Sequence, residues 1–216
     1  MVKKKVVAKK KADVNKLVFK KSYLFVGLIL FLVLLLLIFS SKKEVVNSVD
    51  YEFYNGYEFS RHPQLENVWI TNVMLGDVVQ RFEFRYHPVD LEVFSYDSDA
   101  NQYFFLTQLV DGQVYLSFSE EVLAKQSGYI SLAGYELARI LRGVHGVTVI
   151  VSAENLEEYS WVTCDDASVD DLVVEFRQGS PRIEASDFCI SLYFDDVEDS
   201  LRMSSLLIYK LLGIMD

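Results

Sequence analysis

The sequence predicts a mixed-sheet domain, between the α+β and α/β classes, which one N-terminal transmembrane helix attaches to a membrane. Three observations predict this fold class. A run of about 20 apolar residues precedes acidic sequence. Aromatic residues then alternate with polar ones, which is typical of an antiparallel β-meander. Farther along, a strand–helix–strand pattern and an apolar final helix indicate a mixed sheet covered by helices.

The apolar run predicts a signal-anchor helix over residues 22–41. Tyr23–Phe39 contain no charged side chain, and at 1.5 Å per residue a helix of this length crosses a hydrocarbon core of about 30 Å. Nine Lys lie upstream, so the positive-inside rule places residues 1–21 in the cytoplasm, as a disordered basic tail. Residues 42–50 would then be a short stalk, and 51–216 an external domain.

A cleaved signal peptide is the alternative interpretation of this run. Cleavage requires small residues at positions −3 and −1, whereas "IFSSKK" puts Ile38 or Phe39 at −3. The uncleaved anchor is therefore favoured. Its single glycine, Gly27, and its lack of ionisable residues disfavour a GxxxG dimer face or an ion pathway. We expect the helix to contact the lipid bilayer and to act as a tether.

Charge divides the chain into two parts. Up to Lys43 there are eleven Lys and one Asp, whereas the remainder holds ten basic and thirty acidic side chains. A strongly acidic domain repels phosphate, so nucleic acid is excluded as its partner. The basic tail could contact anionic lipid headgroups, at about 1 kcal/mol per Lys.

The stretch "YEFYNGYEFS" predicts a β-hairpin around Asn55-Gly56. A two-residue type I′ loop pairs Tyr54 with Tyr57 and mixes aromatic side chains with a carboxylate on both faces. A three-residue loop pairs Phe53 with Tyr57 and places four aromatics on one face. Burial at about 1.5–3 kcal/mol per aromatic favours the three-residue loop, although it sets two glutamates opposite each other. In a third possibility, residues 57–60 pair onward with the next strand.

Two further strands complete the predicted meander, which spans residues 51–88. "NVWITNVML" is followed by the turn "GD" and by "VVQRFEFRYHP". In the last segment Phe82, Phe84 and Tyr86 alternate with charged residues, which gives one apolar face. Pro88 ends the strand.

A βαβ unit is predicted next. "VYLSFS" (114–119) is a strand, and "SEE" provides a cap for a helix start. The segment "GYISLAGYELARILRGVHG" has apolar residues at helical spacing and ends in glycines. "VTVIVSA" reads as a strand buried on both faces. Three more strands are predicted in "DLVVEF", "RIEA" and "CISLYF", and a buried helix from about Val197 to Leu212 follows.

The two cysteines, Cys164 and Cys189, lie on the predicted external side, where disulfides persist. One bond between them would stabilise the domain by about 3 kcal/mol in the loop-entropy model. The alternatives are two separate buried thiols and a nucleophilic Cys164. Asp165 and Asp166 beside that thiol disfavour the thiolate, so we expect the disulfide.

Four segments carry a resemblance to known sequences: "YNGYEF", "LAGYELARILRGVHGV", "TCDDAS" and "FCISLYFDDVEDSLRMSSLLIYKLLGIMD". Together they resemble uncharacterised single-pass membrane proteins of small-genome archaea, over most of the external domain. The resemblance implies the topology above. It implies no activity, cofactor or site residue.

Local catalytic and metal-binding motifs are not found, so we expect a protein that is not an enzyme and holds no cofactor. The chain contains no GxSxG, Walker A or GxGxxG pattern. His62, His87 and His145 lack zinc-site spacing, and we expect surface or turn positions for them. Asp97, Asp99 and Asn101 begin as a calcium loop does, but its glycine and its final glutamate are missing. Other acidic runs, such as "DDASVDD" and "DDVED", are interpreted as solvated faces or helix starts; a weak cation site is the alternative.

Three function classes follow: a protein- or envelope-binding module, an anchored extracytoplasmic hydrolase, and a structural subunit of a secretion- or pilus-type complex. We expect the first. Exposed aromatics are typical anchors of protein interfaces, so the loop containing Tyr96, Tyr103 and Phe104 is the predicted partner contact. The alternative is that these aromatics belong to the core, which we favour for those of the hairpin around Asn55.

Overall fold

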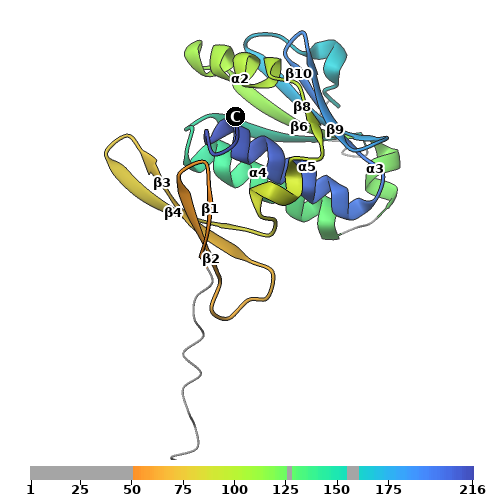
Figure 1. The fold of residues 1–216 in the computed structure, drawn as a ribbon. Helices are drawn as coiled ribbons and strands as arrows, with labels where there is room; N and C mark the ends of the chain where they lie inside the picture. Colours follow the sequence, from red (N-terminus) through yellow and green to blue (C-terminus); the bar gives the residue numbers. More distant parts are fainter. Residues whose placement is uncertain (1–50, 126–127, 155–160) are drawn as a thin grey trace, which may run out of the picture. The chain divides into compact units, whose positions relative to one another are not determined.

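The computed structural model describes residues 51–125, 128–154 and 161–216 (Figure 1). The predicted tail (1–21), anchor helix (22–41) and stalk (42–50) lie outside these residues. Among the described helices, none has the length and hydropathy needed to cross a bilayer. The described residues belong to one structural unit, which consists of a small antiparallel sheet, a larger mixed sheet and the helices packed on them.

The predicted meander is confirmed as a four-stranded antiparallel sheet. Its strands follow chain order: β1 (Tyr51–Tyr54), β2 (Tyr57–Arg61), β3 (Trp69–Leu75) and β4 (Val78–Phe84). Side chains alternate between a buried face and an exposed face, and Phe59, Phe82 and Phe84 lie on the buried one. This sheet is called the meander sheet below.

The predicted three-residue loop of the first hairpin is wrong. Tyr54 pairs with Tyr57, and Asn55 and Gly56 have φ values of 46° and 82°, as a two-residue type I′ turn requires. Contacts with the C-terminal segment account for this register, because Asn55 Nδ2 donates to the Ile214 carbonyl at 3.2 Å. The third possibility is also realised, since β2 pairs onward with β3.

The larger sheet has the strand order β5-β9-β10-β8-β6-β7. Strands β7, β6, β8 and β10 run parallel to one another, as do β5 and β9, whereas β9 runs antiparallel to β10. This confirms a mixed sheet. The strand bounds are β5 (Ser95–Tyr96), β6 (Gln113–Phe118), β7 (Thr148–Ala153), β8 (Asp171–Gln178), β9 (Arg182–Ser186) and β10 (Cys189–Phe194).

The predicted βαβ unit is present: β6 leads through α3 (Glu120–Ala124) and α4 (Gly128–Gly143) to the parallel neighbour β7. Ser119 caps α3, as its side chain accepts a hydrogen bond from the Val122 backbone N–H. The expectation that β7 is buried on both faces is wrong. Within the described chain β7 is an edge strand, and Val151 is exposed on it. A β-branched run therefore did not distinguish an edge strand from a central one.

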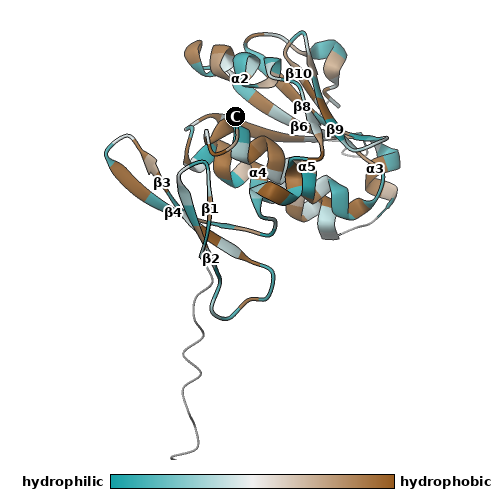
Figure 2. Ribbon diagram, in the orientation of Figure 1, coloured by the Kyte–Doolittle hydropathy of each residue, from teal (hydrophilic) through white to brown (hydrophobic). Residues whose placement is uncertain are grey.

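Helix α5 (Val197–Leu211) links the two sheets, and its predicted burial is confirmed. It packs against α4 and β10 (Figure 1). The Tyr209 ring packs against the Phe84 ring of the meander sheet, with centroids 4.2 Å apart. The Tyr209 hydroxyl donates to the Tyr86 carbonyl at 2.7 Å. Hydropathy colouring shows mostly apolar residues where α4 and α5 meet (Figure 2).

The sequence predicted a loop over residues 96–104, and this prediction is wrong. They end the short strand β5 and enter helix α2 (Asp99–Leu109). Helix α2 contacts β8, β9 and β10. The turn after α2 connects it to β6, and in this turn the Gly112 N–H donates to the Thr107 carbonyl at 2.9 Å. Two short 3-10 helices, η1 (Pro88–Leu91) and η2 (Cys164–Asp166), complete the described elements.

Candidate functional site

A polar cleft of about 380 Å³ opens beside the meander sheet, at the N-terminal ends of α4 and α5. Within it, the Tyr86 hydroxyl donates to Glu198 Oε1 at 3.0 Å, and the same oxygen pairs with Arg202 at 2.8 Å. Burial, and then the bond to Glu198, raises the pKa of Tyr86 well above its usual value. The cleft is lined by Arg61, Glu66, Asn67, Trp69, Arg85, Tyr86, Asp90, Tyr129 and Glu198.

Two carboxylates of this cleft, Asp90 and Glu198, have structural roles. Asp90 Oδ2 accepts the His87 backbone N–H at the start of η1, and Glu198 is neutralised by Arg202. The guanidinium of Arg61 lies 3.6 Å from the ring centroid of Trp69 and thereby covers the indole face. Asp90, Glu198 and Arg61 are thus each engaged with another group of the protein, rather than forming an acid–base pair directed at a substrate.

A second cavity, of about 340 Å³, lies between β4 and α4. Its central carboxylate is Glu136, whose pKa is raised by burial and lowered in part by Arg85 and Arg139. The Arg85 guanidinium lies 3.6 Å from Glu136. The lining residues are Arg81, Glu83, Tyr135, Glu136 and Arg139.

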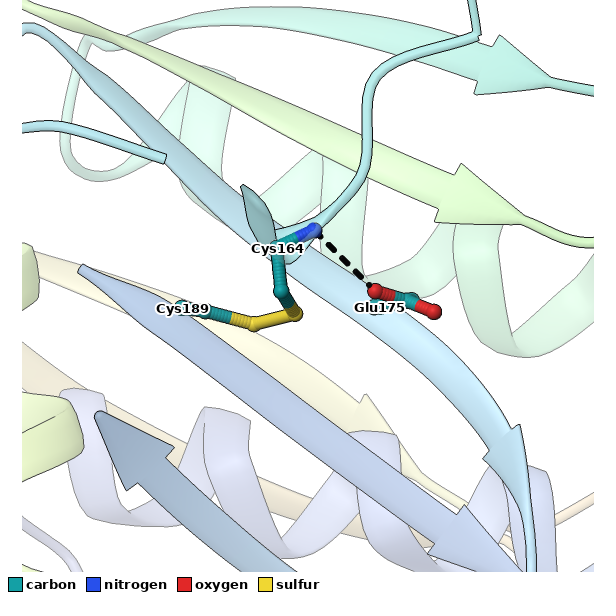
Figure 3. A group of neighbouring side chains, drawn as sticks. All are labelled: Cys164, Glu175 and Cys189. Carbon is teal, nitrogen blue, oxygen red and sulfur yellow. Dashed lines mark hydrogen bonds between the residues drawn. A yellow bond between two sulfur atoms is a disulfide. The ribbon is translucent and has the colours of Figure 1, made fainter. Parts of the chain in front are cut away.

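The predicted disulfide between Cys164 and Cys189 is present, and it joins η2 to β10 across a Cα–Cα distance of 5.2 Å. Figure 3 shows the joined sulfurs beside Glu175, whose carboxylate accepts the Cys164 backbone N–H at 3.2 Å. The sulfurs and this carboxylate lie within 4.8 Å of one another. Metal ligation requires thiolates, and sulfurs bonded to each other do not provide them.

A row of buried polar side chains next to the disulfide was not foreseen. Ser152, Ser117, Glu175 and Ser191 occupy one register row across strands β7, β6, β8 and β10. Two of them hold the segment that enters η2: Ser117 Oγ donates to the Val162 carbonyl at 2.6 Å, and Ser152 Oγ accepts the Val162 N–H at 2.7 Å. Ser117, Ser152 and Glu175 therefore anchor that segment, because they satisfy its backbone groups. Ser191 Oγ contacts the two cysteine sulfurs instead.

The predicted contact residues Tyr96, Tyr103 and Phe104 do not form one exposed patch. Phe104 is buried, and its ring meets His145 edge-on with centroids 4.9 Å apart. Tyr103 is half-buried against Phe188. Tyr96, also half-buried, donates to Asn101 Oδ1 at 2.5 Å. Helical geometry explains the difference, because consecutive residues on α2 point to different sides.

Helix α2 instead exposes neighbouring residues that the sequence analysis missed. Phe105 and Leu109 are 60% and 69% exposed, and at i, i+4 spacing they lie on one side of the helix. Residues 100–110 contain no charged side chain. That eleven-residue gap in an acidic domain was the available signal. Phe105 and Leu109, with half-buried Leu106 and exposed Val110 beside them, are called the α2 face below.

The acidic clusters act as caps and turns where the structure describes them. Asp97 accepts the backbone N–H groups of Asp99 and Ala185, and Asp196 caps α5. The histidines were expected at surface or turn positions: His145 lies in a turn, whereas the imidazole of His87 is almost fully buried. Burial lowers the pKa of both His87 and His145.

Comparison of the chain with protein-family models, with curated proteins and with solved structures finds no match. The resemblance to archaeal single-pass membrane proteins therefore stays a prediction.

Proposed function

We propose that residues 51–216 are a protein-binding module, held outside the membrane by the predicted helix 22–41, and that the α2 face is its contact surface. The basic tail 1–21 is then cytoplasmic, and Tyr23–Phe39 lie in the bilayer. The single observation that carries the proposal is an exposed helix face with apolar side chains and no charge.

Helix α2 is unusual for a helix on the surface of a protein. Such helices normally present charged residues to water, and a helix that is apolar on all sides is normally covered. The buried side of α2 carries Ala100, Phe104 and Thr107, while Phe105 and Leu109 extend from the other side. A second protein placed on the α2 face would provide the missing cover.

The chemistry of the partner follows from charge. Residues 51–216 hold 28 acidic and 10 basic side chains, so two copies of the domain repel each other when they approach closely. We therefore infer a different, less acidic protein with an apolar patch. A subunit of a secretion- or pilus-type complex would meet this description. An anchored hydrolase ranks lower, because Asp90 and Glu198 in the larger cleft are already engaged.

The test is recovery of the partner from gently solubilised native membranes. Phe105→Ser/Leu109→Ser should lose the proteins that co-purify with the wild-type chain, because the contact surface is removed. Val93→Ser is the matched control, since Val93 is an exposed apolar residue outside α2. Unchanged recovery with the double variant, at an unchanged melting temperature, would overturn the proposal.

A further inference from the structure

The meander sheet has a second exposed apolar surface, separate from the α2 face. Tyr51 and Phe53 on β1 are 57% and 72% exposed. Met74 on β3 and Val79 on β4 are 71% and 60% exposed, and they are direct cross-strand partners. Large apolar side chains on three strands of a small sheet thus contact water.

These four side chains lie on the same side of the sheet. Successive residues of a strand alternate between the two faces, and Phe59, Val73 and Phe82 are buried on the face toward the rest of the domain. The register then places Tyr51, Phe53, Met74 and Val79 on the opposite face. We call this the outer face of the meander sheet.

The outer face carries little net charge. At the β4 edge, where the outer face borders the cavity beside α4, Arg81 Nη2 donates to Glu83 Oε1 at 3.0 Å, so these two neighbours neutralise each other. Glu58, opposite Phe53, is the remaining charged residue on this face within the described strands. This near-neutrality contrasts with the acidic excess of residues 51–216. A neutral surface with aromatic and aliphatic side chains is suited to the interfacial region of a bilayer, where amphipathic aromatic rings concentrate.

The chain enters the domain at this same face. Tyr51 is the first described residue and belongs to the face, and nine residues (42–50) separate it from the predicted helix 22–41. Nine extended residues reach about 30 Å at most. A short tether keeps the domain at a high effective concentration near the membrane, so that weak partitioning of a few side chains suffices for contact.

We propose that the outer face of the meander sheet lies on the bilayer surface, where Tyr51, Phe53, Met74 and Val79 enter the headgroup region. The inference depends on the proposed membrane tether. It gives the domain a fixed orientation, in which the meander sheet meets lipid and the α2 face belongs to a different part of the domain.

The experiment uses the full chain at one copy per nanodisc of zwitterionic lipid, with a nitroxide on the lipid headgroup. A fluorophore is attached to Phe53→Cys, to Met74→Cys or to the control Phe105→Cys, with Cys164–Cys189 left oxidised. Lipid contact should quench the fluorophores at positions 53 and 74 several-fold more than at 105. The double substitution Tyr51→Glu/Val79→Glu should reduce the quenching at position 53, because two charges then oppose entry into the headgroups.

The outcomes separate the two proposals. A chain that does not insert into the disc overturns the tether, and this inference with it. An inserted chain with equal quenching at positions 53, 74 and 105 overturns only the membrane contact. Labels at 53 and 74 that become shielded only at two copies per disc would also overturn it, because a second copy would then cover the face.

Discussion

At the scale of single residues, the disulfide and the polar row beside it hold one segment to the larger sheet. The disulfide joins Cys164 to Cys189, 25 positions farther along the chain. Ser117, Ser152 and Glu175 bind the backbone of residues 162–164. A covalent bond and several hydrogen bonds therefore fix the same short stretch.

The first prediction concerns this bond. Cys164→Ser/Cys189→Ser should lower the free energy of unfolding by about 3 kcal/mol, because the unfolded chain gains loop entropy. Denaturant unfolding measures the loss, and wild-type protein under reducing conditions is the matched control. Equal midpoints for the variant and the oxidised wild type would contradict it, as would mass spectrometry that finds both thiols free.

The second prediction concerns the histidines. Burial lowers the pKa of His87 and His145 below the usual 6.5. As the pH falls through this value, the unfolded chain binds protons that the folded chain does not, so stability decreases. The free energy of unfolding, measured by denaturant titration at pH values from about 7.5 to about 5.5, should show this loss. The variant His87→Gln/His145→Gln should lose less stability over the same pH range. If the free energy of unfolding changes equally with pH in the variant and the wild type, the two histidines are not the cause of the loss.

Cysteine pairing was predictable from the sequence, because two cysteines allow only one intramolecular bond. The polar row was not. Ser117, Ser152, Glu175 and Ser191 lie in four separate strands, and their meeting depends on strand order and register, which no local pattern specifies. Burial of His87 was missed for the same reason, since the rings around it come from β1, β2 and β3.

At the scale of elements, strong periodicity correctly predicted helices and strands. The absence of periodicity did not correctly predict a loop. The helix at 128–143 and the alternation in β4 follow simple patterns, and both are confirmed. Helix α2 was missed because its apolar residues occur on all sides, so that no amphipathic pattern marks it. The first hairpin was placed in the wrong register because local burial arguments could not include contacts with Gly213 and Ile214.

The third prediction separates the two sides of α2. Phe104→Ala should lower the free energy of unfolding by about 3–5 kcal/mol, because it leaves a cavity in the core. Phe105→Ala should change it by no more than about 0.5 kcal/mol, because Phe105 faces water. Thermal or denaturant unfolding of both variants tests this, and equal losses would mean that Phe105 is also part of the core.

The fourth prediction concerns the hairpin turn. Gly56 has a positive φ of 82°, and a side chain at such a position costs about 1–2 kcal/mol. Gly56→Ala should therefore destabilise the domain by about that amount. Gly143→Ala is the matched control, because Gly143 lies in α4 with open space around its Cβ position. A hairpin that tolerates Gly56→Ala as well as the control would argue against the type I′ turn.

At the scale of the whole molecule, the domain combines a predicted tether with two separate exposed surfaces. The outer face of the meander sheet is proposed to meet lipid, and the α2 face is proposed to meet a protein. Such a division would present the partner-binding helix at a constant orientation to the membrane.

The fifth prediction tests the topology. A thiol introduced by Ala8→Cys should be shielded from an impermeant reagent in intact cells, whereas one introduced by Gln102→Cys, at an exposed position of α2, should react. Permeabilised cells are the control, in which both thiols should react. Reaction at position 8 alone would reverse the predicted orientation.

The α2 face is proposed to contact another protein in the native membrane. Site-specific photocrosslinking in intact cells tests it most directly, with a photoreactive amino acid at position 105 or 109 and a control at exposed Glu120. We expect one discrete adduct, the same from positions 105 and 109, and none from 120. No adduct from either α2 position, or the same adduct from all three, would contradict it.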